Sequence, residues 1–166
     1  VERVVAVELD VVRAVLRREA LEHDGEHYRI PYSGPGATGL GKPLKLMARP
    51  LRADIPIYLA VFRPRSVELA AEIADGWLPI FFSPERARET FPAPFARGDG
   101  FDIAPAVPAL VSDDLESARD ALRPYYALYI GGMGARGTNF YNDLVASYGF
   151  EAEAKKIQDL FLDGKQ

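Results

Sequence analysis

The run Ile55-Pro56-Ile57-Tyr58-Leu59-Ala60-Val61 and the later run Trp77-Leu78-Pro79-Ile80-Phe81-Phe82 decide the fold of this 166-residue chain. Both runs are apolar, which predicts strands that are buried on both faces of a parallel sheet. Between them, residues 67–74 place apolar side chains at helical spacing, and Asp75-Gly76 ends that pattern. A strand, a helix and a second strand in this order are typical of an α/β fold.

The flanking sequence continues this alternation. Residues 103–111 predict a third strand, Ser83-Pro84 predicts the start of a helix with an N-cap serine, and Asp113 to Glu116 resembles a capping box. We also expect helices over residues 2–21, 113–129, 139–148 and 151–162, the second of them bent at Pro124. Between the first helix and the first strand, we expect a turn at Asp24-Gly25, an extended piece over 27–30 and a loop over 33–43. A closed parallel barrel needs about eight strands and only three are visible, so we expect the chain to hold part of a larger sheet.

Composition excludes several classes of protein. Hydrophobic residues make up 48% and charged residues 27% of the chain, which is a normal globular balance. The chain has no cysteine, which excludes disulfides, a thiol nucleophile and thiolate metal sites. No apolar run approaches the roughly 18 residues of a membrane span, and the net charge of −4 comes without a basic stripe for nucleic acid. We therefore expect a cytoplasmic protein that binds neither nucleic acid nor membrane.

Two glycine-rich segments imitate phosphate-binding motifs. Residues 34–42 satisfy the glycine spacing of a dinucleotide fingerprint and most of a P-loop, but Pro43 stands where a P-loop needs Ser or Thr. Prolines bracket the residues that should open a helix, so we interpret this segment as a structural loop. Gly132, Gly134 and Gly137 have the same spacing but follow a helical pattern, which indicates a linker between helices.

Catalytic and metal-ligating residues are hard to find. The two histidines, His23 and His27, flank an Asp-Gly turn without further ligands, so we expect no metal site and no Ser-His-Asp site. The tyrosines Tyr125, Tyr126 and Tyr129 are interpreted as packing aromatics and not as catalytic acids. No catalytic residue can be named from the sequence.

One loop has the properties of an anion site. Phe62, Arg63, Arg65 and Ser66 follow a predicted strand and open a helix at Pro64. In α/β folds ligands gather at the carboxyl ends of strands, and a helix N-terminus offers free N–H groups to a phosphate. Phe62 could lie against a planar ring. The alternative is an ordinary solvated loop, in which arginines are common.

Several long segments resemble the luciferase-like monooxygenase superfamily, in particular its F420-dependent oxidoreductase branch. The segments that carry the resemblance are Thr38 to Lys45, Asp54 to Ala60, Glu68 to Pro79, Tyr129 to Gly137 and Asn139 to Leu144. The resemblance implies a TIM (β/α)8-type barrel, of which residues 1–166 would be a single partial domain, the C-terminal portion. It also implies that Phe62, Arg63, Arg65 and Ser66 bind the cofactor phosphate. Many relatives have glycine where this chain has Arg63.

The resemblance therefore leads to a leading hypothesis and two alternatives. The chain would be the C-terminal part of an F420-dependent oxidoreductase that transfers hydride between the deazaflavin and a small organic substrate. The first alternative is an FMN-dependent monooxygenase of the same superfamily. The second is a truncated or split barrel that acts as a non-catalytic binding or assembly module, paired with a missing barrel half or with another copy of itself.

Overall fold

The computed structural model describes residues 2–39 and 41–165, so that Leu40 of the glycine-rich loop lies outside the described residues. The chain divides into two compact units, residues 1–57 and residues 58–166, which are described separately here. This division does not test the expectation of one partial barrel domain over residues 1–166, which stays a prediction.

The first unit contains one helix and one hairpin. Helix α1 spans Glu2–Leu16, and strands β1 (His23–Asp24) and β2 (Arg29–Ile30) pair in antiparallel register around the predicted turn. The helix is shorter than the predicted 2–21 because Arg18 adopts a left-handed conformation with φ 58°, which ends the helical backbone. The predicted loop over 33–43 is confirmed for its described residues.

The second unit is built on a three-stranded parallel sheet. Strands β3 (Tyr58–Leu59), β4 (Gly76–Trp77) and β5 (Asp102–Ile103) lie in the order β3-β4-β5, with Tyr58 opposite Gly76 and Gly76 opposite Asp102. The three predicted parallel strands are therefore present, in the predicted order along the chain. Each is shorter than predicted because prolines, which cannot donate to the ladder, interrupt the apolar runs, and only a bridge between Ile80 and Ala106 extends the pairing.

Helices connect and flank these strands. Helix α2 (Pro64–Ile73) joins β3 to β4, whereas α3 (Ala87–Thr90), α4 (Pro92–Ala96) and the short 3₁₀ turn Gly98–Gly100 join β4 to β5. The expected start of a helix at Ser83-Pro84 is wrong, because residues 84–86 form a turn and α3 begins at Ala87. The Ser83 hydroxyl donates to the Glu85 carboxylate at 3.2 Å, so it does not cap the helix.

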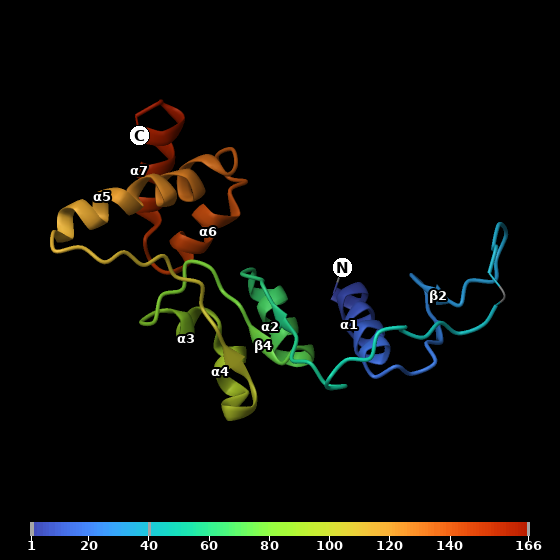
Figure 1. Ribbon diagram of the computed structural model, residues 1–166. Helices are drawn as coiled ribbons and strands as arrows, with labels where there is room; N and C mark the ends of the chain where they lie inside the picture. The colour runs from blue at the N-terminus through green and yellow to red at the C-terminus, as the bar shows by residue number, and fades with distance from the viewer. Residues whose placement is uncertain (1, 40, 166) are drawn as a thin grey trace. The chain divides into compact units, whose positions relative to one another are not determined.

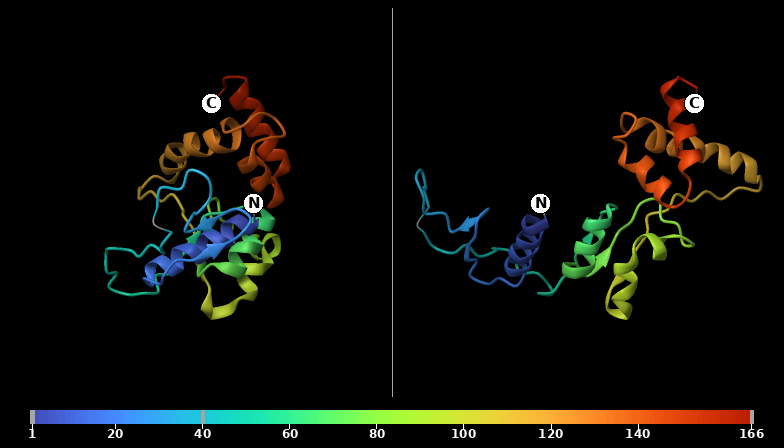
Figure 2. Two further views of the ribbon diagram at one scale, coloured as in Figure 1. Left: turned by 90° about the vertical axis from the view of Figure 1, so that its right-hand side faces the viewer. Right: turned by 180° about the vertical axis from the view of Figure 1, so that it is seen from behind.

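Helices α5 (Leu115–Tyr126), α6 (Phe140–Ser147) and α7 (Glu151–Leu162) follow, as predicted, and stay grouped in every view of Figures 1 and 2. Asp114 caps α5, because its carboxylate accepts the Glu116 N–H at 3.0 Å and the Ser117 hydroxyl at 2.6 Å. Beyond Pro124 the helix widens into a π-helical segment over Ala127–Gly132. The glycine-rich residues after it link η2, this π-helical segment, to α6, as expected.

The hydrophobic core of the second unit centres on Trp77, whose side chain is fully buried. The other buried members of this core come from α2 and its end, from the residues between α3 and β5, and from α6 and its end, and they are Val67, Ala74, Phe91, Phe101, Leu144 and Tyr148. The Phe91 ring meets the indole edge-on, with centroids 5.3 Å apart. The sheet and the helices therefore share one core, and this core holds the carboxyl ends of the strands in position.

Gly76 is required by close packing in the central strand. A Cβ at this position would lie 2.3 Å from the Tyr58 ring and 2.9 Å from the Asp102 carbonyl oxygen. We predict that Gly76→Ala lowers the free energy of unfolding by about 1–3 kcal/mol, since the Asp102 backbone cannot move without breaking the ladder. Urea denaturation checks this, with Gly100→Ala as control, because a Cβ there meets no described atom within 4 Å.

Tyr148 gives the stability of the fold a pH dependence. Burial raises the pKa of the Tyr148 hydroxyl from 10.0 to about 12. The unfolded state therefore loses this proton first, and stability that is complete below pH 10 falls as the pH rises towards 12. We predict that the chain loses about 2 kcal/mol more than Tyr148→Phe across this window. Equal alkaline slopes in urea titrations of the two proteins would contradict this.

Candidate functional site

The loop between β3 and α2 lies at the carboxyl edge of the sheet and is held there by the core. The Trp77 indole N–H donates to the Val61 carbonyl at 2.6 Å, which fixes the loop one residue before the first predicted site residue, Phe62. Arg63 is the N-cap of α2 with extended backbone angles, φ −83° and ψ 140°, and Pro64 occupies the first helical turn. The loop and helix start are therefore as the sequence predicts.

The two arginines of this loop have different surroundings. The Arg63 guanidinium lies 3.8 Å from the centroid of the Phe140 ring, at the start of α6, in a cation–π contact. Arg65 is exposed, and Ser66 beside it is partly buried. The backbone N–H groups of Arg65 and Ser66 belong to the first turn, where a helix offers no carbonyl acceptors. A positive side chain, a hydroxyl and free N–H groups thus gather at one helix end.

Phe62 belongs to a group of rings at the same edge, which we call the aromatic cluster. Its members, from loops and helices far apart in the sequence, are Phe62, Phe81, Tyr125, Tyr126, Tyr129 and Tyr141. Tyr141 stacks on Phe62 at 5.2 Å and meets Phe81 edge-on at 5.9 Å, so it joins the loops that follow β3 and β4. Phe81 has a left-handed backbone with φ 51°, a costly conformation for an aromatic residue.

The predicted packing role of Tyr125, Tyr126 and Tyr129 is therefore confirmed, and their partner is Phe81. Burial raises the pKa of the Tyr125 hydroxyl above its ordinary value of 10.0. The neutral rings form an apolar surface beside the loop.

Two asparagines hold the start of α6 in place. The Asn139 side chain is buried, accepts the N–H groups of Tyr141 and Asn142 as an N-cap, and donates to the carbonyls of Tyr129 and Ile130 at 2.9 and 3.0 Å. Asn142 donates to Ile130 and to Ala154 of α7. These bonds connect the start of α6 to the π-helical segment and to α7.

The sequence does not predict that the loop has Phe81, Phe140 and Tyr141 as neighbours. Their own sequence gives no sign of it, because Phe81 lies inside an apolar run and the other two begin an ordinary helical pattern. The N-cap signature of Asn139 fixes where α6 begins, but not what that end contacts. Within residues 2–39 and 41–165, no group of three or more metal-binding side chains is found, and none of the helices could cross a membrane.

Comparison with known proteins now decides the family. The sequence model of the luciferase-like monooxygenase family matches residues 8–166. The chain belongs to this family. It is 44% identical, over 95% of its length, to a Mycobacterium tuberculosis protein named "Putative coenzyme F420-dependent oxidoreductase", and 30% identical, over 75% of its length, to the 5,10-methylenetetrahydromethanopterin reductase of Archaeoglobus fulgidus.

The chain covers only part of these luciferase-like relatives. It spans 48% of the length of the mycobacterial protein and 36% of the length of the archaeal reductase. The three-stranded parallel sheet with flanking helices is consistent with the luciferase-like family, and a complete barrel is not described by these residues.

Asn139 offers a test of how the site is held together. We predict that Asn139→Ala lowers the free energy of unfolding by about 2–4 kcal/mol, because it removes a helix cap and the donor to the Tyr129 carbonyl, whereas the Ile130 carbonyl keeps the amide of Asn142. Thermal denaturation checks this, with Thr138→Ala as the neighbouring control. Thr138 is exposed and makes one side-chain bond, to Ala135, so its loss should cost less than about 0.5 kcal/mol. Similar losses of stability in both variants would contradict the inference that Asn139 holds the start of α6 in place.

Proposed function

We propose that the chain supplies the phosphate side of the cofactor site in an F420-dependent oxidoreductase, which transfers hydride between the deazaflavin and a small organic substrate. The observation that carries this proposal is the gathering of anion donors at the start of α2, at the carboxyl edge of the parallel sheet. The name of the mycobacterial relative, a coenzyme F420-dependent oxidoreductase, supports the choice of cofactor.

The residues at the loop fit a phosphate group. Arg65 brings an exposed guanidinium, Ser66 a hydroxyl, and the first turn of α2 brings N–H groups and the positive end of the helix dipole. Arg63 serves the site differently, because its guanidinium lies on Phe140 and holds the loop against α6. We therefore assign phosphate binding to Arg65 and Ser66 and loop positioning to Arg63.

The bound deazaflavin would supply the carbon that accepts or releases hydride. The chain's own part is to bind and orient that cofactor and to exclude water from one side of it. Phe62 lies in the same loop as the phosphate donors and would be the residue to lie against a planar ring, and Tyr141 stacks on it at 5.2 Å. No general acid or base is assigned to these residues.

Two other functions follow from particular observations. The matching family is described as a monooxygenase family, which favours FMN as the competing cofactor. The described sheet has β3 and β5 as edge strands, which would suit a non-catalytic module that pairs with another barrel half or a second copy.

Titration of the chain with F420 and with FMN tests the proposal. We expect F420 to bind more tightly, and Arg65→Ala to weaken F420 binding about tenfold through loss of charge-assisted hydrogen bonds. Lys156→Ala is the control, since this exposed lysine on α7 has the same charge and lies far along the chain from the loop. The Arg65 variant should also flatten the dependence of affinity on salt.

The other outcomes are equally informative. Tighter binding of FMN would replace the deazaflavin assignment by the monooxygenase alternative. A folded chain that binds neither cofactor and sediments as an oligomer would favour the assembly module.

A further inference from the structure

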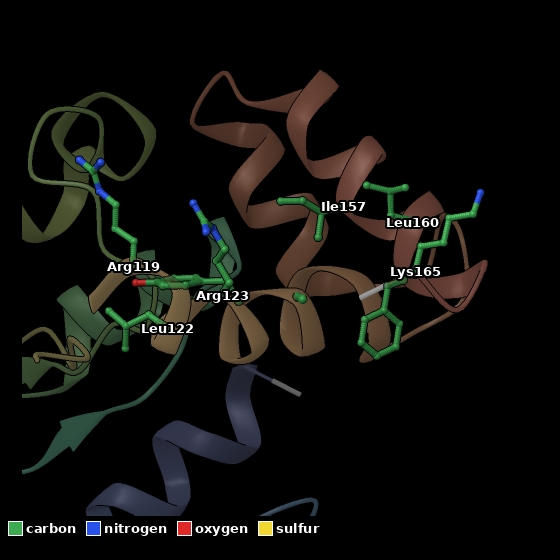
Figure 3. A pocket seen from close by; sticks show the side chains of 9 residues that line it. Arg119, Leu122, Arg123, Ile157, Leu160 and Lys165 are labelled. Atoms are coloured by element: carbon green, nitrogen blue, oxygen red, sulfur yellow. The ribbon is translucent and has the colours of Figure 1, made fainter. Parts of the chain in front are cut away.

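A concave surface lies between α5 and α7, within the second unit (Figure 3). It encloses about 550 Å³. Its lining residues come from α5, the π-helical segment and the end of α7, and they are Arg119, Leu122, Arg123, Tyr126, Ala127, Ile157, Leu160, Phe161 and Lys165. We call this surface the α5–α7 groove. Its volume lies within the roughly 300–1,000 Å³ that is usual for small-molecule sites.

The walls of the groove are apolar and have no cover within the described chain. Helix α5 is amphipathic, yet none of its residues is buried, although the structure describes all of them. Leu122 and Tyr126 recur at helical spacing on the face that lines the groove. Opposite them, Leu160 keeps 39% of its surface exposed. A ligand here would bury apolar surface from both helices.

The cationic side chains at the groove differ in whether they already have an ion-pair partner. Arg119 pairs with Glu116, and Arg123 pairs with Asp120 and Glu116. Lys165 lines the groove at the end of α7 and makes no ion pair with the part of the chain that the structure describes. In Figure 3 the two arginines project from α5, whereas Lys165 stands at the opposite end. Its ammonium group is therefore the cation that is free to meet a new anion.

Lys165 is also held in position. Gly164 adopts a left-handed conformation with φ 73°, and the Lys165 N–H donates to the Leu160 carbonyl at 2.9 Å. The Gly164 N–H donates to the Phe161 carbonyl at 3.0 Å, which completes a C-terminal cap of α7. The cap sets the lysine beside the apolar wall.

We propose that the α5–α7 groove binds a small apolar carboxylate, with the hydrocarbon part along Leu122, Ile157 and Leu160 and the carboxylate beside Lys165. The volume, the apolar walls and the free cation at one end all favour a ligand of this shape and charge. The test of this proposal is independent of the cofactor assignment, because neither Leu160 nor Lys165 belongs to the loop at α2 or to the aromatic cluster, although the groove and the cluster share Tyr126.

Decanoate is the probe, and calorimetric titration of the chain is the measurement. We expect saturable binding of one decanoate that Leu160→Glu weakens at least tenfold, since the new carboxylate repels the ligand and removes apolar wall. Leu162→Glu is the matched control, because Leu162 is 44% exposed on the same helix and does not line the groove. Circular dichroism verifies that both variants fold.

The charge requirement is tested separately. Lys165→Ala should weaken decanoate about fivefold and leave the uncharged decanol unchanged, whereas Lys156→Ala should change neither. Equal affinity for decylammonium, equal effects of the two lysine variants, or no saturable decanoate binding would each overturn the proposal. Binding of an acidic amphipathic peptide in place of decanoate would assign the groove to a protein partner instead. Leu160→Glu should leave F420 binding intact, so the two proposals fail independently.

Discussion

The hydrogen bond from the Trp77 indole to the Val61 carbonyl, 2.6 Å long, links the core to the loop that carries the candidate site. Trp77 lies in the central strand and is fully buried, so its orientation is set by the packing of sheet and helices. A buried indole N–H requires an acceptor, and the Val61 carbonyl of the loop after β3 provides it. The position of Phe62 and of the start of α2 therefore depends on the core.

A second constraint acts from the opposite direction, through α6. The amide groups of Asn139 and Asn142 donate to three backbone carbonyls. Those of Tyr129 and Ile130 belong to the π-helical segment, and that of Ala154 belongs to α7. The start of α6 is fixed in consequence, and Phe140 and Tyr141 come to lie against Arg63 and Phe62. The loop is thus held by the core on one side and by the helical end on the other.

The sequence predicts the elements of this arrangement better than their contacts. Apolar runs, proline and capping residues locate the three strands and helices α2, α5, α6 and α7, because these signals act within a few residues. The strand lengths and the start of α3 were misjudged, since ladder pairing and turns around Ser83 and the prolines depend on neighbours far along the chain. The same limit explains why Phe81 could not be predicted at the site, because its ring contacts are to tyrosines more than 40 residues further along the chain.

Arg63 stands in the candidate site where the resemblance to the luciferase-like family leads us to expect glycine. A glycine is needed where the backbone is left-handed or where a ligand must approach the Cα closely. At Arg63 the backbone is extended, with φ −83° and ψ 140°, so an ordinary residue is accommodated without strain. Its guanidinium lies over the Phe140 ring at the start of α6. Arg63 therefore contacts α6, and Arg65 and Ser66 are the residues to which we assign the phosphate in the proposed site.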